Sequence, residues 1–220
     1  EAADDFSGWS GSLSSDGTRV AIGAYGNDGA NGSNSGHVRV YAYAEGRGVN
    51  NWTQLGTDID GEAVGDFSGW SVSLSSDGTR VAIGAYGNDG ANGSASGHVR
   101  VYELNGNTWT QLGTDIDGEA AYDQSGHSVS LSSDGSRVAI GAYFNDGANG
   151  IGSGHVRVYS LPTTDSDGDG ILDPADNYDL AVTEKTDGSR RLTTVPASGS
   201  STCSLATFSV DTNVATSKAG

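Results

Sequence analysis

The chain has 220 residues and a formal net charge of −17, with 28 acidic residues against 11 lysines and arginines. Phosphate backbones and anionic lipids would repel such a chain, so we expect no nucleic-acid binding. No run approaches the roughly 20 apolar residues of a membrane-spanning helix, so we also expect no direct membrane insertion. Glycine supplies 35 residues without a strict triplet period, which excludes collagen.

Residues 66–102 are nearly a copy of residues 5–41, from which they differ at only two positions. A third, looser copy runs over residues 123–159. Self-similarity at this length indicates one supersecondary unit that is repeated along the chain, each unit burying its apolar faces against the next. The copies therefore predict a series of thin sheets rather than one large helical core.

Each copy is expected to form four short strands, which in the second copy span 70–74, 80–85, 98–103 and 108–116. In the second of these strands, Val81, Ile83 and Ala85 point to one face, while small residues occupy the other face. A nearly bare face lets a neighbouring sheet approach closely, as the inner strands of a propeller blade require. The segment SSDG at 75–78 is predicted to be a tight turn between the first two strands.

The third copy ends differently from the other two. After Tyr159 the chain passes to residues 160–162 and never supplies the segment WTQLGTDIDG that forms the expected fourth strand. We therefore expect an open edge on the third sheet. Open edges recruit strands, so either the rest of the chain or another chain is expected to fill this one.

Composition divides the chain into three regions. Residues 1–161 hold the repeats, residues 162–178 form an acidic linker, and residues 179–220 form a Ser/Thr-rich β tail or the start of a further domain. The copies span 1–61, 62–118 and 119–161. The single cysteine, Cys203, excludes an internal disulfide framework and is either a buried, reduced thiol or half of a bond to another chain.

Three segments of the second copy form a recognisable pattern: residues 67–72 read FSGWSV, residues 81–86 read VAIGAY and residues 97–102 read GHVRVY. In these segments the chain resembles the FG-GAP family, the blade unit of integrin-α-like β-propellers, over about residues 1–160. The resemblance implies an all-β fold of tandem four-stranded propeller-type blades, of which this chain has three, the third lacking its own fourth strand. From the rest of the sequence we expect a calcium loop and a short β-rich tail after them. The resemblance also implies a secreted, extracellular or cell-surface protein.

Propellers of this family close with several more blades than three. The resemblance therefore leaves three arrangements open for this chain. It continues upstream, it shares a ring with another chain, or it stacks its blades without closing a ring.

The linker contains the segment DSDGDGILDPADN at 165–177, which has the spacing of a calcium-binding loop. Oxygen ligands fall at positions 1, 3, 5, 9 and 12, and a backbone carbonyl at position 7. These ligands are Asp165, Asp167, Asp169, Asp173 and Asp176, with the carbonyl of Ile171. The segment also resembles a thrombospondin type 3 repeat, with Tyr178 where that family usually has cysteine. The alternative is a solvated acidic linker, but so many adjacent carboxylates would repel one another without a counterion. We expect Ca2+ to stiffen the joint between repeats and tail.

The recurring histidines, His37, His98 and His155, stand next to arginine-containing strands in every copy. A catalytic group is normally singular, whereas these are multiplied with the scaffold, so we expect no enzyme activity from them. Hydrogen bonds to carboxylates of the fourth strands explain them more simply. The expected partners are Asp58, Asp60, Asp115 and Asp117.

The leading hypothesis is a non-enzymatic extracellular structural or adhesive repeat protein. Strand donation to the open edge would assemble it into a fibre or a surface layer, and its partners would be further copies or other extracellular proteins and glycans. The alternative is a glycan-binding or carbohydrate-active propeller module. Its site would use non-repeated residues, of which the third copy offers Tyr122, His127 and Phe144.

Overall fold

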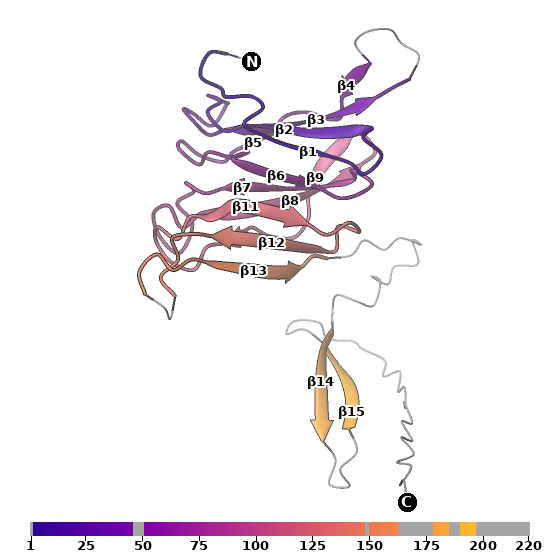
Figure 1. Ribbon diagram of the computed structural model, residues 1–220, viewed down its shortest axis with the longest axis vertical. Coiled ribbons are helices and arrows are strands. Elements are labelled where there is room, and N and C mark those ends of the chain that lie inside the picture. Colours follow the sequence, from indigo (N-terminus) through magenta and orange to yellow (C-terminus); the bar gives the residue numbers. More distant parts are fainter. Residues whose placement is uncertain (1, 46–50, 148–149, 163–177, 185–189, 197–220) are drawn as a thin grey trace, which may run out of the picture. The chain divides into compact units, whose positions relative to one another are not determined.

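The computed structural model describes residues 2–45, 51–147, 150–162, 178–184 and 190–196. It divides into two compact units, residues 1–162 and residues 163–220. All regular secondary structure in these described ranges is β-strand, which confirms the predicted all-β fold (Figure 1). Accordingly, the described residues contain no apolar helix of membrane-spanning length.

The first copy forms one antiparallel sheet. Its strands follow the order β1-β2-β3-β4, and β5 pairs with the other end of β3. The strands are β1 (Ser10–Leu13), β2 (Arg19–Ala24), β3 (His37–Tyr43), β4 (Trp52–Gln54) and β5 (Ile59–Asp60).

The second copy forms an equivalent sheet. Its strands are β6 (Ser71–Leu74), β7 (Arg80–Ala85), β8 (His98–Asn105), β9 (Thr108–Gln111) and β10 (Ile116–Asp117). The predicted continuous fourth strand, 108–116, is wrong in detail, because β9 and β10 are separate and both pair with β8. Gly113 lies between them at a φ of 76°, and this left-handed turn interrupts the ladder.

The third copy forms a sheet of three strands, β11 (Ser125–Leu131), β12 (Arg137–Ala142) and β13 (His155–Ser160). Within the described ranges β13 is the last strand of this sheet, as the missing fourth-strand segment predicted. In the second unit, β14 (Tyr178–Glu184) and β15 (Arg190–Pro196) pair with each other in antiparallel register.

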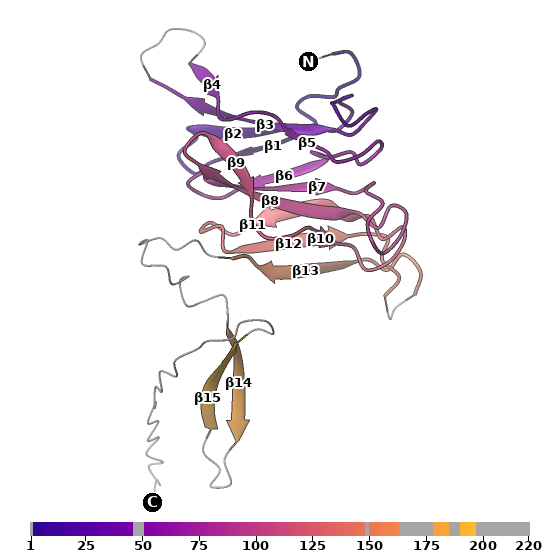
Figure 2. The same cartoon turned by 180° about the vertical axis from the view of Figure 1, so that it is seen from behind.

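The three sheets of the first unit lie face to face, with the second sheet between the other two in both views (Figures 1 and 2). Strand β7 is consequently buried along its whole length. Two apolar clusters fill the spaces between the sheets. The first joins Val38 and Val40 to Leu74, and the second joins Val99 and Val101 to Val138.

Glycine on the inner strands permits this close approach. A Cβ atom on Gly84 of β7 would lie 2.0 Å from the carbonyl oxygen of Gly126 in the third sheet. Gly23 of β2 faces Gly69 of the second sheet in the same way, at 2.1 Å. The small-residue face predicted from the sequence therefore brings the backbones of neighbouring sheets into contact.

This packing predicts that Gly84→Ala destabilises the protein by about 1–3 kcal/mol, because the new methyl group meets backbone that cannot move alone. Urea unfolding followed by circular dichroism measures the change. Gly141→Ala is the matched control in the third sheet. Its Cβ would approach only the hydroxyl of the exposed Ser128, at 2.3 Å, which can rotate away. Equal losses in the two variants would contradict the close-approach explanation.

Candidate functional site

The same two hydrogen bonds recur at both interfaces between sheets. In the first of these bonds, a serine hydroxyl on the first strand of one sheet donates to a glycine carbonyl of the next sheet. The pairs are Ser10 with Gly69 at 2.7 Å and Ser71 with Gly126 at 2.8 Å. In the second, a leucine backbone N–H donates to a serine hydroxyl of the preceding sheet. The pairs are Leu74 with Ser12 and Leu131 with Ser73, both at 2.9 Å.

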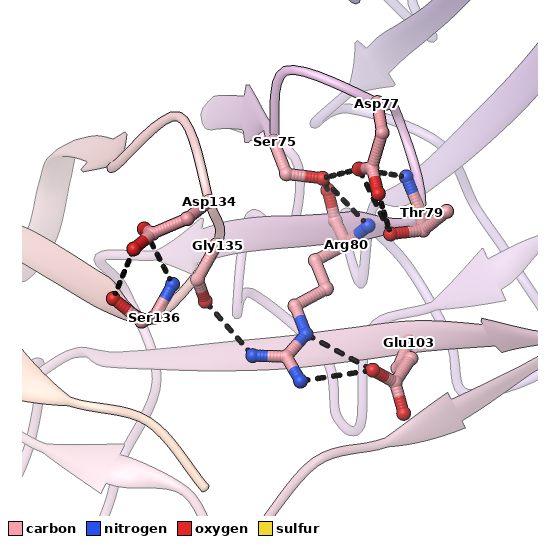
Figure 3. Close-up of polar contacts among 8 residues, drawn as sticks. All are labelled: Ser75, Asp77, Thr79, Arg80, Glu103, Asp134, Gly135 and Ser136. Carbon is pink, nitrogen blue, oxygen red and sulfur yellow. Dashed lines mark hydrogen bonds and ion pairs between the residues drawn. The ribbon is translucent and has the colours of Figure 1, made fainter. Parts of the chain in front are cut away.

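The tight turn of the second sheet is held by Asp77. Its Oδ1 accepts hydrogen bonds from the Ser75 hydroxyl at 2.6 Å and from the Thr79 backbone N–H at 3.0 Å (Figure 3). Burial acts to raise the pKa of Asp77, but these hydrogen bonds outweigh it, so the pKa lies below the usual value. In the third copy, hydrogen bonds from Ser132 and Ser136 lower the pKa of Asp134 to about 2. The turns therefore carry ionised carboxylates at neutral pH, which supports the turn prediction.

Arg80 follows this turn and connects the second sheet to the third. Its Nη1 donates to the carbonyl of Gly135 at 3.0 Å, and its Nε and Nη2 each lie 3.0 Å from Oε1 of Glu103 (Figure 3). The first interface has the same contact, since Arg19 Nη1 donates to the Gly78 carbonyl at 3.1 Å. Arg80 is therefore buried between two sheets and paired, as a buried guanidinium must be.

The buried histidines lie near two of the predicted partners, Asp58 and Asp115, at ion-pair distances that are longer than the predicted hydrogen bonds. Nδ1 of His98 is 3.8 Å from Oδ2 of Asp115 and 3.9 Å from Oε2 of Glu62. Nδ1 of His37 is 3.9 Å from Oδ2 of Asp58. Burial, and next the positive charge of Arg100, lower the pKa of His98, so its imidazole is neutral at pH 7.

These two clusters also have the composition of cation sites. Their ligand atoms lie within 4.8 Å of one another in His37, Asp58 and Asp60, and in Glu62, His98 and Asp115. Arginines already bind the same carboxylates, with Arg39 Nη2 at 2.7 Å from Asp58 and Arg100 Nη1 at 3.3 Å from Glu62. Because the guanidinium groups supply the positive charge, we interpret both clusters as ion-pair networks within the scaffold.

Aromatic rings form a row across the three sheets. Trp9 and Trp70 have ring centroids 4.8 Å apart, and His127 continues the row 5.5 Å from Trp70. The ring centroids of His127 and Tyr143 are 4.3 Å apart, so His127 takes the packing position that tryptophan has in the first two copies. Of the three non-repeated residues named from the sequence, His127 therefore has a packing role in this row.

The strongest difference between the copies is the exposure of equivalent valines. Val99 and Val101 of β8 are fully buried against the third sheet, whereas their equivalents on β13, Val156 and Val158, are 68% and 64% exposed. We call this surface of the third sheet, with Ser128, Ser130, Arg137, Val156 and Val158, the trailing face. In the first two copies, the serines and the arginine at the equivalent positions form hydrogen bonds to the next sheet.

The opposite end of the series exposes the complementary surface. Leu13 of β1 is 61% exposed, although its equivalent in the second copy, Leu74, is buried against the first sheet. Val20 and Ile22 are also less buried than their equivalents on β7. We call Leu13, Val20 and Ile22 the leading face. The two faces are the two halves of the interface that joins the sheets internally.

Two further sets of acidic residues are not members of these faces: the loop aspartates and the predicted calcium ligands. The loop aspartates Asp28, Asp89 and Asp146 accept backbone N–H groups six residues ahead at 2.7–2.8 Å. They therefore act as turn formers. The predicted calcium ligands lie outside the described residues and remain a prediction: Asp165, Asp167, Asp169, Ile171, Asp173 and Asp176.

Comparison with known proteins gives one family match. The model of the FG-GAP repeat matches residues 57–102, which run from the end of the first copy to β8. Comparison with curated proteins found no relative. FG-GAP repeats are typical of extracellular or surface proteins.

Similar solved structures include Kuenenia stuttgartiensis hydrazine synthase, at 13% identity and a TM-score of 0.41. The match covers 68% of this chain and 44% of that chain, so the present chain spans less than half of its length. A likeness this weak carries no argument about function. The match of residues 57–102 to the FG-GAP repeat agrees with the motifs found in the sequence of the second copy.

Proposed function

We propose that the protein is a non-enzymatic extracellular structural or adhesive module that assembles with further copies of itself. The trailing face of one copy packs on the leading face of the next. The observation that supports this proposal is the exposure of Val156 and Val158, which stand where the other two copies bury valine against a following sheet.

The chemistry of the two faces favours a second copy as the occupant. Val156 and Val158 would meet Leu13, as Val38 and Val40 share a buried cluster with Leu74 inside the chain. Ser130 would accept the N–H of Leu13, by analogy with Ser73 and Leu131. Burying one valine or leucine side chain stabilises an interface by about 1.5–3 kcal/mol before the cost of association.

Such a contact joins different surfaces of the two partners. Heterologous contacts produce rings when the rotation closes and open filaments when it does not. Among the residues that the structure describes, no strand pairs with the outer edge of β13, whereas β9 and β10 pair with the corresponding edge of β8, so this edge offers a second contact. A strand donated to β13 would complete the third sheet in the assembly.

Sedimentation velocity over a concentration series tests this proposal. The wild-type chain is expected to assemble increasingly with concentration, and more strongly at high ionic strength, because salt screens the repulsion between acidic copies. Val158→Asp should abolish assembly, since it places a charge in the centre of the trailing face. The fold should persist, because the side chain is exposed.

Val64→Asp is the matched control. Val64 is 68% exposed, like Val156, but lies in a loop of the second copy, away from either face. It should assemble like the wild type. A wild-type chain that stays monomeric at all concentrations, or equal losses in both variants, would refute the assembly proposal.

We further propose that residues 165–177 bind one Ca2+ ion and stiffen the joint. The support is the ligand spacing and the charge repulsion that a bound cation would relieve. In isothermal titration, one calcium site is expected on the full chain, and Asp169→Asn should weaken it at least about tenfold by removing a charged ligand.

Asp28→Asn serves as the control for that titration, since Asp28 is an exposed turn aspartate of the first copy. It should bind calcium like the wild type. Calcium binding that survives Asp169→Asn unchanged, or no calcium binding to the wild type, would exclude the proposed loop site.

A further inference from the structure

The third copy contains a pocket that its own substitutions create. The pocket has a volume of about 370 Å³, and residues of the loop that joins β12 to β13 form part of its lining. Three of its lining residues are Tyr122, Phe144 and Ile151. The second copy has Gly65, Gly87 and Ser94 at the equivalent positions. The apolar walls are therefore specific to the third copy.

A coordinated exchange opens this space. In the second copy, Phe67 stacks on Tyr86 with ring centroids 5.3 Å apart, and a Cβ on Gly87 would lie 2.3 Å from the carbonyl oxygen of Gly65 and 2.7 Å from the Phe67 ring. A phenylalanine at position 87 could not coexist with that packing. The third copy replaces both residues at once, with Gln124 in place of Phe67 and Phe144 in place of Gly87.

The exchange moves an aromatic ring from an internal stack to the pocket wall. The ring centroids of Phe144 and Tyr143 are 4.1 Å apart, but the Phe144 side chain stays half exposed. Tyr122 has a φ of 66°, in the left-handed region that favours glycine, and the second copy has a glycine at this position. The first copy has Asp4 at the same position with a φ of 65°, so the left-handed turn belongs to the scaffold and only the aromatic side chain is specific to the third copy.

The polar side of the pocket is acidic and lacks basic residues among its lining. Asp123 is buried, and its Oδ2 accepts hydrogen bonds from Ala120 N–H and from the Asn145 amide. Oδ1 of Asp146 accepts the Gly152 N–H at 2.7 Å. The carboxylates disfavour an anionic ligand, and Gln124 offers both a donor and an acceptor.

We infer that this pocket binds a neutral sugar residue, with Tyr122 and Phe144 against the apolar face of the ring and Asp146 and Gln124 at its hydroxyl groups. Aromatic walls with a few convergent polar groups are the usual composition of a small-molecule site. An organic cation could also use the rings and carboxylates, so choline is included as a competing probe in the test. The site is independent of the leading and trailing faces.

Saturation-transfer difference NMR on the full chain tests the inference with D-glucose, D-galactose, D-mannose and N-acetylglucosamine as probes. At least one is expected to receive saturation at its ring protons, with millimolar affinity. The informative variant converts the pocket to the second copy's sequence, through Tyr122→Gly, Gln124→Phe, Phe144→Gly and Ile151→Ser. It should fold, because these residues already fit the same backbone, and its sugar affinity should fall at least tenfold.

The converse variant supplies the control. Gly65→Tyr, Phe67→Gln, Gly87→Phe and Ser94→Ile install the pocket in the second copy, which should raise the stoichiometry from one site to two. No transfer to any of the four sugars, or transfer that survives the conversion of the third copy, would overturn the inference. Transfer to choline in place of the sugars would overturn it in favour of a cation site.

Discussion

Direct contact between the backbones of neighbouring sheets is the constraint on which this structure depends. Gly23 and Gly84 leave no side chain between an inner strand and the next sheet. The serine hydroxyls can therefore reach glycine carbonyls across the interface, as Ser71 does to Gly126. Arg80 adds a hydrogen bond to the Gly135 carbonyl across the same interface, and its guanidinium is paired with Glu103 within its own sheet. A larger residue at either glycine would separate all of these groups at once.

An interface repeated along a chain has a consequence for function. The second sheet uses one face toward the first copy and the other toward the third copy, so within the described part of residues 1–162 the first and third sheets each keep one such face uncovered. Leu13 and Val158 mark these two surfaces. Exposed apolar residues on otherwise acidic, polar surfaces commonly mark interaction sites. Assembly and the internal fold would then rest on the same contacts, which explains why the copies are so similar in sequence.

Much of the fold follows from local patterns. Alternating residues in Arg80–Ala85 predicted a strand with one bare face, and the structure uses that face for close packing. The missing segment after Tyr159 predicted the three-stranded third sheet. The split of 108–116 was missed because Trp109, Leu112 and Ile116 were assigned to one strand across Gly113, where the chain turns. The exposure of Val156 depends on which sheets meet in space, and near-identical copies give no local signal of that. Tyr122 and Phe144, by contrast, could be named from the sequence because they depart from the repeat.

Disulfide cross-linking between two single-cysteine variants tests most directly whether copies meet through the internal interface. Leu13→Cys and Val158→Cys are each made in a Cys203→Ser background and mixed under mild oxidation. Head-to-tail stacking predicts a cross-linked product in the mixture and none from either variant alone. Cross-linking of Leu13→Cys with itself, or none in the mixture, would contradict the account.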